Sequence, residues 1–193
     1  RKSAYEMPSS QSERRLLWGG AFAVQLPSNC IDASELRQVP DNQEVYLHPR
    51  HDQSVMLELL EPLAGSDSVE SAAREFFTDL ADANGGSASS RIVECRLLSN
   101  EAWPLRQFAY LVGEQLVAKY NESARNLVQM HILLHRLAEH SCDLAVTLNH
   151  PISVCSESSS SSLLDPESAW QPDELISRIV ESLELLDPTI FNA

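Results

Sequence analysis

Residues 68–83, SVESAAREFFTDLADA, decide the fold because their apolar side chains repeat at the spacing of one helix face. The repeat follows the i, i+3, i+4, i+7 pattern through Val69, Ala72, Ala73, Phe76, Phe77, Leu80 and Ala81. Asp67 and Glu70 have the spacing of a capping box at the start of this helix, and the Gly85-Gly86 pair can end it. A helix with one apolar face must cover another apolar surface.

Four extended segments of β character follow this helix, at residues 91–98, 107–120, 127–137 and 143–149. No long helical repeat separates them, and parallel neighbours would need a longer crossover connection. The segments are therefore expected to form an antiparallel meander.

Three further strands are predicted before the helix. Phe22, Val24 and Leu26 alternate with smaller or polar residues, which is the period of a half-buried strand that starts the sheet. Residues 44–48 and 55–59 alternate in the same way, and the short polar loop between them predicts an antiparallel pair.

A second one-sided helix is predicted after Pro172, where Asp173 and Glu174 suit the positive end of the helix dipole. Its apolar residues are Leu175, Ile176, Ile179, Val180, Leu183 and Leu186. Two one-sided helices and a sheet with two faces predict an α+β fold, an α/β/α sandwich around a mainly antiparallel sheet of about six strands.

The chain length suits a single domain, expected over residues 16–193. Residues 1–15 are basic and polar and lack the apolar core of a secretory signal, so a disordered tail is expected there. Residues 156–162 are nearly all serine, which predicts a mobile loop, with phosphorylation as the alternative interpretation. No apolar run approaches the roughly 20 residues of a membrane span.

The net charge limits the classes of binding partner, and the cysteine spacing limits the kinds of metal or redox site. Fourteen Lys and Arg against 28 Asp and Glu leave a net charge of −14, which disfavours nucleic acid and anionic lipid and favours a basic protein surface. The alternative is that the acids only form solvated helix faces. The four cysteines include no Cys-x-x-Cys pair, which favours reduced thiols in the nucleus or cytoplasm over a zinc or redox site.

Motifs for enzymatic chemistry are absent from the sequence. There is no GxxxxGK[ST] loop, no GxGxxG turn and no GxSxG elbow, so we predict neither catalysis nor a cofactor. His131 and His135 have a helical metal spacing, but their surroundings alternate as in a strand, which favours ordinary sheet histidines over a metal site. His48, His51, His140 and His150 are expected to be loop residues that titrate near neutral pH.

Residues 31–46, IDASELRQVPDNQEVY, place acidic side chains around a proline turn. Asp32 and Glu35 have capping-box spacing, so a short helical turn is predicted to end near Pro40, and Asp32 is expected to cap it. Arg37 can pair with Glu35 or Asp41. Taken alone, the Pro-Asp-Asn turn is a way to reverse the chain, and its acids face water as turn residues do.

The same stretch resembles the Ran guanine nucleotide release factors, the Mog proteins of nuclear transport. The resemblance extends to the Gly19-Gly20 opening, to HRLAEHSCDLAVTLNHP at residues 135–151 and to LLDPTIF at residues 185–191. It implies an α/β/α fold, binding of the small GTPase Ran, release of its nucleotide and a role in nuclear protein import. It also implies a location in the nucleus and the cytoplasm.

Within the VPDxQEV motif, the resemblance implies Ran binding by Asp41 and Glu44, with lesser roles for Asp32, Arg37 and Gln43. Pro40 fixes its own backbone angle, so the two carboxylates would reach Lys or Arg on the partner at low ordering cost. We expect the chain to be a monomer that binds Ran. Cooperation with a second Ran-binding protein is left open. The alternatives are an acidic adaptor that leaves nucleotide affinity unchanged and a small-molecule-binding module.

Overall fold

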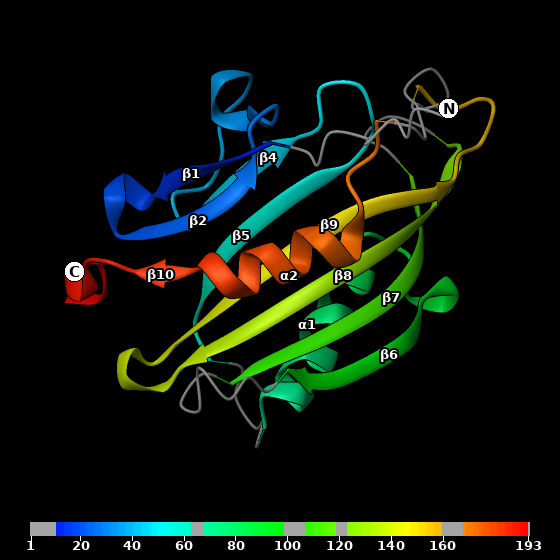
Figure 1. The fold of residues 1–193 in the computed structure, drawn as a ribbon. Helices are drawn as coiled ribbons and strands as arrows, with labels where there is room; N and C mark the ends of the chain where they lie inside the picture. The colour runs from blue at the N-terminus through cyan, green and yellow to red at the C-terminus, as the bar shows by residue number, and fades with distance from the viewer. Residues whose placement is uncertain (1–10, 63–67, 99–106, 119–122, 160–167, 193) are drawn as a thin grey trace, which may run out of the picture.

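The computed structural model describes residues 11–62, 68–98, 107–118, 123–159 and 168–192. A seven-stranded antiparallel sheet in the order β3-β4-β5-β9-β8-β7-β6 forms the middle layer (Figure 1). Helix α1 covers one face, and helix α2 covers the other together with a three-stranded sheet in the order β1-β2-β10. The predicted α/β/α sandwich is confirmed.

The strands of the large sheet are β3 (Ile31–Asp32), β4 (Gln43–Leu47), β5 (Ser54–Leu60), β6 (Arg91–Leu98), β7 (Phe108–Ala118), β8 (Arg125–Leu137) and β9 (Cys142–Ser153). The small sheet consists of β1 (Ser12–Leu17), β2 (Phe22–Pro27) and β10 (Glu184–Leu185). The helices are α1 (Val69–Ala83) and α2 (Pro172–Ser182), with short 3-10 turns that include η1 (Trp18–Gly20), η2 (Ala33–Glu35) and η4 (Ala138–His140). The antiparallel meander from β6 to β9 is confirmed, and β5 pairs with β9 beside it.

Helix α1 packs on β6, β7 and β8 through the apolar stripe that the sequence predicts. Phe77 lies against Gly113 of β7, where an added Cβ would stand 2.3 Å from the ring of Phe77. The absence of a side chain at this position therefore lets the helix approach the sheet closely.

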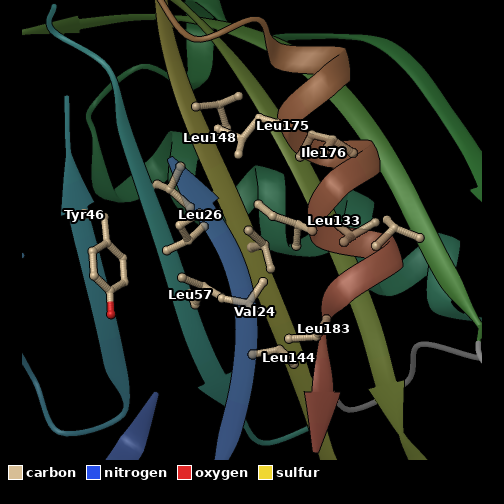
Figure 2. Packing of buried hydrophobic residues seen from close by; sticks show 14 of the residues in the cluster. Val24, Leu26, Tyr46, Leu57, Leu133, Leu144, Leu148, Leu175, Ile176 and Leu183 are labelled. Atoms are coloured by element: carbon tan, nitrogen blue, oxygen red, sulfur yellow. The ribbon is translucent and has the colours of Figure 1, made fainter. Parts of the chain in front are cut away.

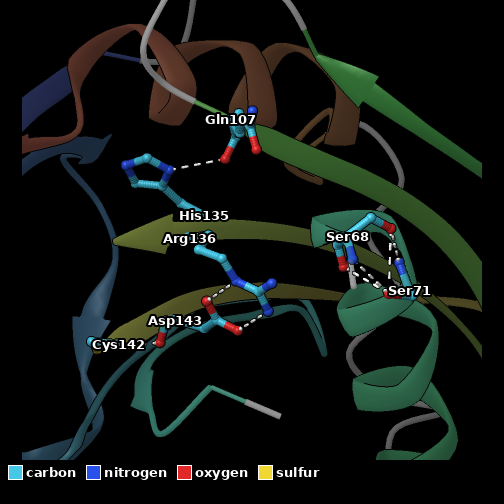
Figure 3. Close-up of polar contacts among 7 residues, drawn as sticks. All are labelled: Ser68, Ser71, Gln107, His135, Arg136, Cys142 and Asp143. Carbon is cyan, nitrogen blue, oxygen red and sulfur yellow. Dashed lines mark hydrogen bonds and ion pairs between the residues drawn. The ribbon is translucent and has the colours of Figure 1, made fainter. Parts of the chain in front are cut away.

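The cap of α1 differs from the expected Asp67–Glu70 box. The backbone N–H of Ser71 donates to Ser68 Oγ at 3.1 Å, and the N–H of Ser68 donates to Ser71 Oγ at 3.1 Å (Figure 3). The reason is that Ser68 has the extended backbone of the N-cap and helical geometry begins at Val69. Asp67 lies outside the described residues.

Helix α2 packs on the opposite face of the sheet, where it meets β2 and β8. Figure 2 shows the shared core, with side chains from α2, from β2 and from the large sheet facing one another. The labelled members are Val24, Leu26, Tyr46, Leu57, Leu133, Leu144, Leu148, Leu175, Ile176 and Leu183.

Two expectations about the N-terminal region are corrected. Residues 12–15, assigned above to a disordered tail, belong to β1, which pairs with β2 from Ser12 opposite Pro27 to Leu17 opposite Phe22. Pairing with β2 satisfies their backbone hydrogen bonds and buries Leu17. The strand at residues 22–27 does not start the large sheet but is the middle strand of the small one. Residues 1–10 lie outside the described part.

The serine-rich segment is described only as far as residue 159. Residues 156–159 form a turn in which Ser158 is buried and accepts a 3.0 Å hydrogen bond from Asn126 Nδ2. Among the described helices, none is long and apolar enough to cross a membrane.

Candidate functional site

The candidate site, which we call the acidic corner, comprises residues 31–44 at the β3 edge of the large sheet. Strand β3 pairs with β4, and the chain then turns through η2 before it returns into β4. The turn is closed by the N–H groups of Leu36 and Arg37, which both donate to Ala33 O at 3.0 Å. The corner is therefore a hydrogen-bonded connection and not an open loop.

Asp32 stabilises the start of this turn. Its Oδ1 accepts a 2.8 Å hydrogen bond from the N–H of Ser34, and its backbone is extended as at a helix N-cap. The predicted capping role of Asp32 is confirmed. One oxygen of this carboxylate is already engaged within the chain.

Asp41 is exposed on a backbone that is held in place on both sides. The N–H of Gln43 donates to Pro40 O at 2.9 Å, which closes the turn around Asp41. Asn42 ties the turn to β5, because Asn42 Nδ2 donates to Leu59 O at 3.1 Å and the N–H of Leu59 donates to Asn42 O at 2.9 Å. A partner would meet this carboxylate on backbone that is already ordered.

Glu44 is half-buried and has a structural contact that the sequence did not indicate. Its Oε1 accepts a 2.6 Å hydrogen bond from the backbone N–H of Trp18, which has a φ of +47° in the turn between β1 and β2. Such charge-assisted bonds are short and strong. Glu44 therefore joins the acidic corner to the small sheet, whereas Asp41 faces solvent.

Tyr46 adds to this junction from the same face of β4. Its hydroxyl lies 3.5 Å from Glu44 Oε2 as a potential donor. Burial, together with the nearby carboxylates of Glu44 and Asp32, raises the pKa of Tyr46 above its ordinary value. The hydroxyl consequently stays protonated at neutral pH and available to donate to Glu44.

The other candidate residues do not converge on one point. Gln43 is the neighbour of Glu44 on β4 and therefore points to the opposite face, where its Nε2 donates to Glu58 Oε1 at 2.8 Å. Arg37 is exposed and donates to Gln38 O at 3.4 Å, and it forms no ion pair with Glu35 or Asp41 within the described residues. The predicted Arg37 pairing is not formed, and the guanidinium bonds the neighbouring backbone instead.

Two residues of this region were missed by sequence reasoning. Glu58 faces Gln43 across the β4–β5 pair, and the register of two alternating strands is the signal that could have found it. Leu36 is 66% exposed at the end of η2, so the corner also offers an apolar side chain among its acids. An isolated exposed leucine is common, and no sequence signal distinguished this one.

His131 and His135 lie on strand β8 as predicted, where His131 Nδ1 is 2.6 Å from the hydroxyl of Tyr110 and His135 ring-stacks on Phe108. His150 was expected to be a loop residue but lies on β9, where it packs beside His51 and, through it, His48. The centroids of His48 and His51 are 5.9 Å apart, and those of His51 and His150 are 6.0 Å apart.

The acidic corner presents the exposed acids Glu35 and Asp41 on hydrogen-bonded backbone. Among the described residues, no group of three His, Cys, Asp or Glu side chains is placed to hold a metal ion. A surface of this kind can attract and orient basic side chains of another protein.

Comparisons with known proteins agree on one relationship. Residues 15–151 match the family described as Ran-interacting Mog1 protein. The chain is 40% identical over 183 residues to a Homo sapiens protein named Ran guanine nucleotide release factor, and the match covers 91% of this chain and 94% of that protein. A Danio rerio protein of the same name is 38% identical over 92% of this chain and 98% of its own length.

A solved structure has the same fold. The crystal structure of the Saccharomyces cerevisiae Ran-binding protein Mog1p superposes with a TM-score of 0.73 at 23% identity, over 95% of this chain and all of that one. At this identity the similarity supports the arrangement of strands and helices described above.

Proposed function

Because this chain belongs to the family of Ran-interacting Mog1 proteins, we propose that it binds the small GTPase Ran, promotes loss of Ran's guanine nucleotide and supports nuclear protein import. The observation that carries this proposal is the 40% identity to a protein named Ran guanine nucleotide release factor over nearly the full length of both chains. We infer from this role that the protein is present in both the nucleus and the cytoplasm.

Release of the nucleotide requires no covalent chemistry from this chain. A protein that binds nucleotide-free Ran more tightly than nucleotide-bound Ran must weaken nucleotide binding by the same factor. The free energy of docking on the nucleotide-free state is therefore the driving force for release.

Asp41 is proposed as the principal contact with a basic group on Ran. It is exposed and its backbone is ordered by the contacts of Pro40, Asn42 and Gln43. Glu44 has two roles in this proposal. One of its oxygens accepts the hydrogen bond that holds the Trp18 turn, and its negative charge adds to the electrostatic potential that attracts a basic group of Ran. Asp32, Arg37 and Gln43 contribute at the periphery by shaping the turn and the β4 edge.

The test is the rate at which a fluorescent guanine nucleotide leaves preloaded Ran in a stopped-flow measurement. Removing one partner of a desolvated charge pair costs about 2–5 kcal/mol, so the double variant Asp41→Lys/Glu44→Lys should weaken release at least about thirtyfold. The matched control is Glu75→Lys/Asp79→Lys, which also replaces one Glu and one Asp by Lys but does so on the exposed face of α1. Equal release by wild type and the corner variant would refute the assignment of these residues.

A second readout separates release from mere binding. If the protein is an adaptor, it will bind Ran and leave the equilibrium affinity of Ran for its nucleotide unchanged. If it is a release factor, saturating amounts will lower that affinity, and Ran loaded with excess nucleotide will in turn bind the protein more weakly.

A further inference from the structure

Strand β6 forms the second edge of the large sheet, opposite the acidic corner. It pairs with β7 on one side, and no described strand pairs with its other side. Its outer row of backbone N–H and C=O groups is therefore not paired in a ladder within the described part of the chain, and it can accept another strand. With eight residues it is much longer than β3 at the other edge.

The side chains of β6 are unusually exposed for a strand of this fold. Val93 and Leu97 are each 50% exposed, and Glu94 and Arg96 form an ion pair with each other at the surface. The strand carries two arginines, Arg91 and Arg96, against one acid, in a chain with a net charge of −14. The local charge of this edge therefore does not add to the repulsion between two copies of this acidic protein.

Symmetry leaves few ways to pair β6 with a second copy of itself. On an edge strand, every second residue points its backbone groups outward, and antiparallel strands pair outward residues only with outward residues. A two-fold axis must therefore lie between one residue and the same residue of the second copy. The register with β7 is regular from Glu94 to Leu98, and the axis can be placed at Glu94, Cys95, Arg96 or Leu97, which each have described neighbours.

Only one of these positions matches the side chains. With the axis at Cys95, Glu94 faces Arg96 of the second copy and Arg96 faces Glu94. With the axis at Arg96, two arginines would face each other, and with the axis at Glu94, two glutamates would face each other. With the axis at Leu97, Arg96 would face Leu98. Opposite charges on facing residues stabilise a strand pair, and like charges destabilise it.

We propose that β6 is a self-association edge, which joins two copies of this chain in antiparallel register around Cys95. The irregularity of β6 between Ile92 and Glu94 and its surface charges would hinder pairing with most other strands, because bulges and charges are common protections of a sheet edge. The same charges favour this one register with a second copy. The proposal is independent of Ran binding and replaces the monomer expected from the sequence.

The experiment is sedimentation velocity of the full chain over a wide range of concentrations. Wild type should show reversible, concentration-dependent dimerisation. The single variants Glu94→Arg and Arg96→Glu each turn two attractive contacts into repulsive ones, so each should dimerise about tenfold more weakly or worse. Circular dichroism and thermal unfolding of each variant confirm that it folds.

Mixing the two variants separates contacts between copies from the ion pair within one copy. In the mixture, two arginines of one chain face two glutamates of the other, so heterodimers should form although each variant alone stays largely monomeric. The double variant Glu94→Arg/Arg96→Glu should dimerise like wild type for the same reason. The proposal is overturned if wild type remains monomeric at its solubility limit, if the single variants associate as strongly as wild type, or if the mixture fails to associate.

Discussion

The two edges of the large sheet are built in opposite ways. The β3 edge has two paired residues and continues into the acidic corner, where side chains and turns occupy several of the backbone groups. The β6 edge has eight residues, an open backbone row and side chains of both charges. A short edge can recognise a partner mainly through side-chain charge, whereas a long edge can also add a strand. The fold thus separates two kinds of recognition at opposite ends of one sheet.

Phe77→Ala is expected to have the largest effect on stability and on the difference between the two sheet edges. The change removes a buried ring that packs on Gly113, which should cost about 3–5 kcal/mol of unfolding free energy in a denaturant titration. Because α1 packs on β6, β7 and β8, hydrogen exchange should accelerate more at the β6 edge than at the acidic corner.

Ile179→Ala is the matched change on the other face, since Ile179 of α2 is fully buried. Ile179→Ala should destabilise the chain without accelerating hydrogen exchange preferentially at the β6 edge. Equal acceleration of exchange at both edges in the Phe77→Ala variant would show that α1 does not support one edge selectively.

An acid-dependent loss of stability is expected next. Burial and the nearby His150 lower the pKa of His131 to about 4, although Asp173 opposes this shift, and burial also lowers the pKa of His150. In the unfolded chain a histidine titrates near about 6.5, so the unfolded state takes up protons first as the pH falls. Stability should be complete above about pH 6.5 and decline between about pH 6.5 and pH 4.

This sensitivity arises in the middle of the large sheet, because His131 lies on β8 and His150 on the neighbouring strand β9. Chemical denaturation at several pH values should show a smaller pH slope for His131→Gln than for wild type. An unchanged slope in that variant would mean that other groups cause the acid sensitivity.

A smaller effect should distinguish the two acids of the corner. Glu44→Ala leaves the N–H of Trp18 without its charged acceptor, which should cost about 1–3 kcal/mol of stability. Asp41→Ala removes an exposed side chain and should change stability by no more than about 0.5 kcal/mol, while it still slows nucleotide release. Thermal unfolding of the two variants measures the difference, and equal stability losses would contradict the separate roles assigned here.

Much of the fold could be predicted because its signals are periodic. The apolar stripes of α1 and α2 and the alternation of β5 each reflect burial on one face. The central strands β7, β8 and β9 are instead buried over long runs, between α1 and α2. The small sheet could not be predicted in the same way. Residues 12–15 lack an apolar alternation and become a strand only because β2 offers them backbone partners.

The candidate site was predictable in its location but not in its contacts. The Pro40 turn and the cap by Asp32 follow from local chemistry, so sequence alone can place them. The bond from Trp18 to Glu44 and the contact between Gln43 and Glu58 join segments that are distant or separately patterned in the chain. Such contacts depend on tertiary packing, and no local spacing encodes them.

Docking of Ran on the acidic corner can be tested directly by a heteronuclear NMR titration of the isotope-labelled chain with nucleotide-free Ran. We expect amide signals of residues 41–44 and of the neighbouring Trp18 turn to shift or broaden first, signals of residues 91–98 to stay unchanged, and Asp41→Lys to suppress the change. A footprint centred on β6 with the corner unperturbed would show that Ran docks elsewhere.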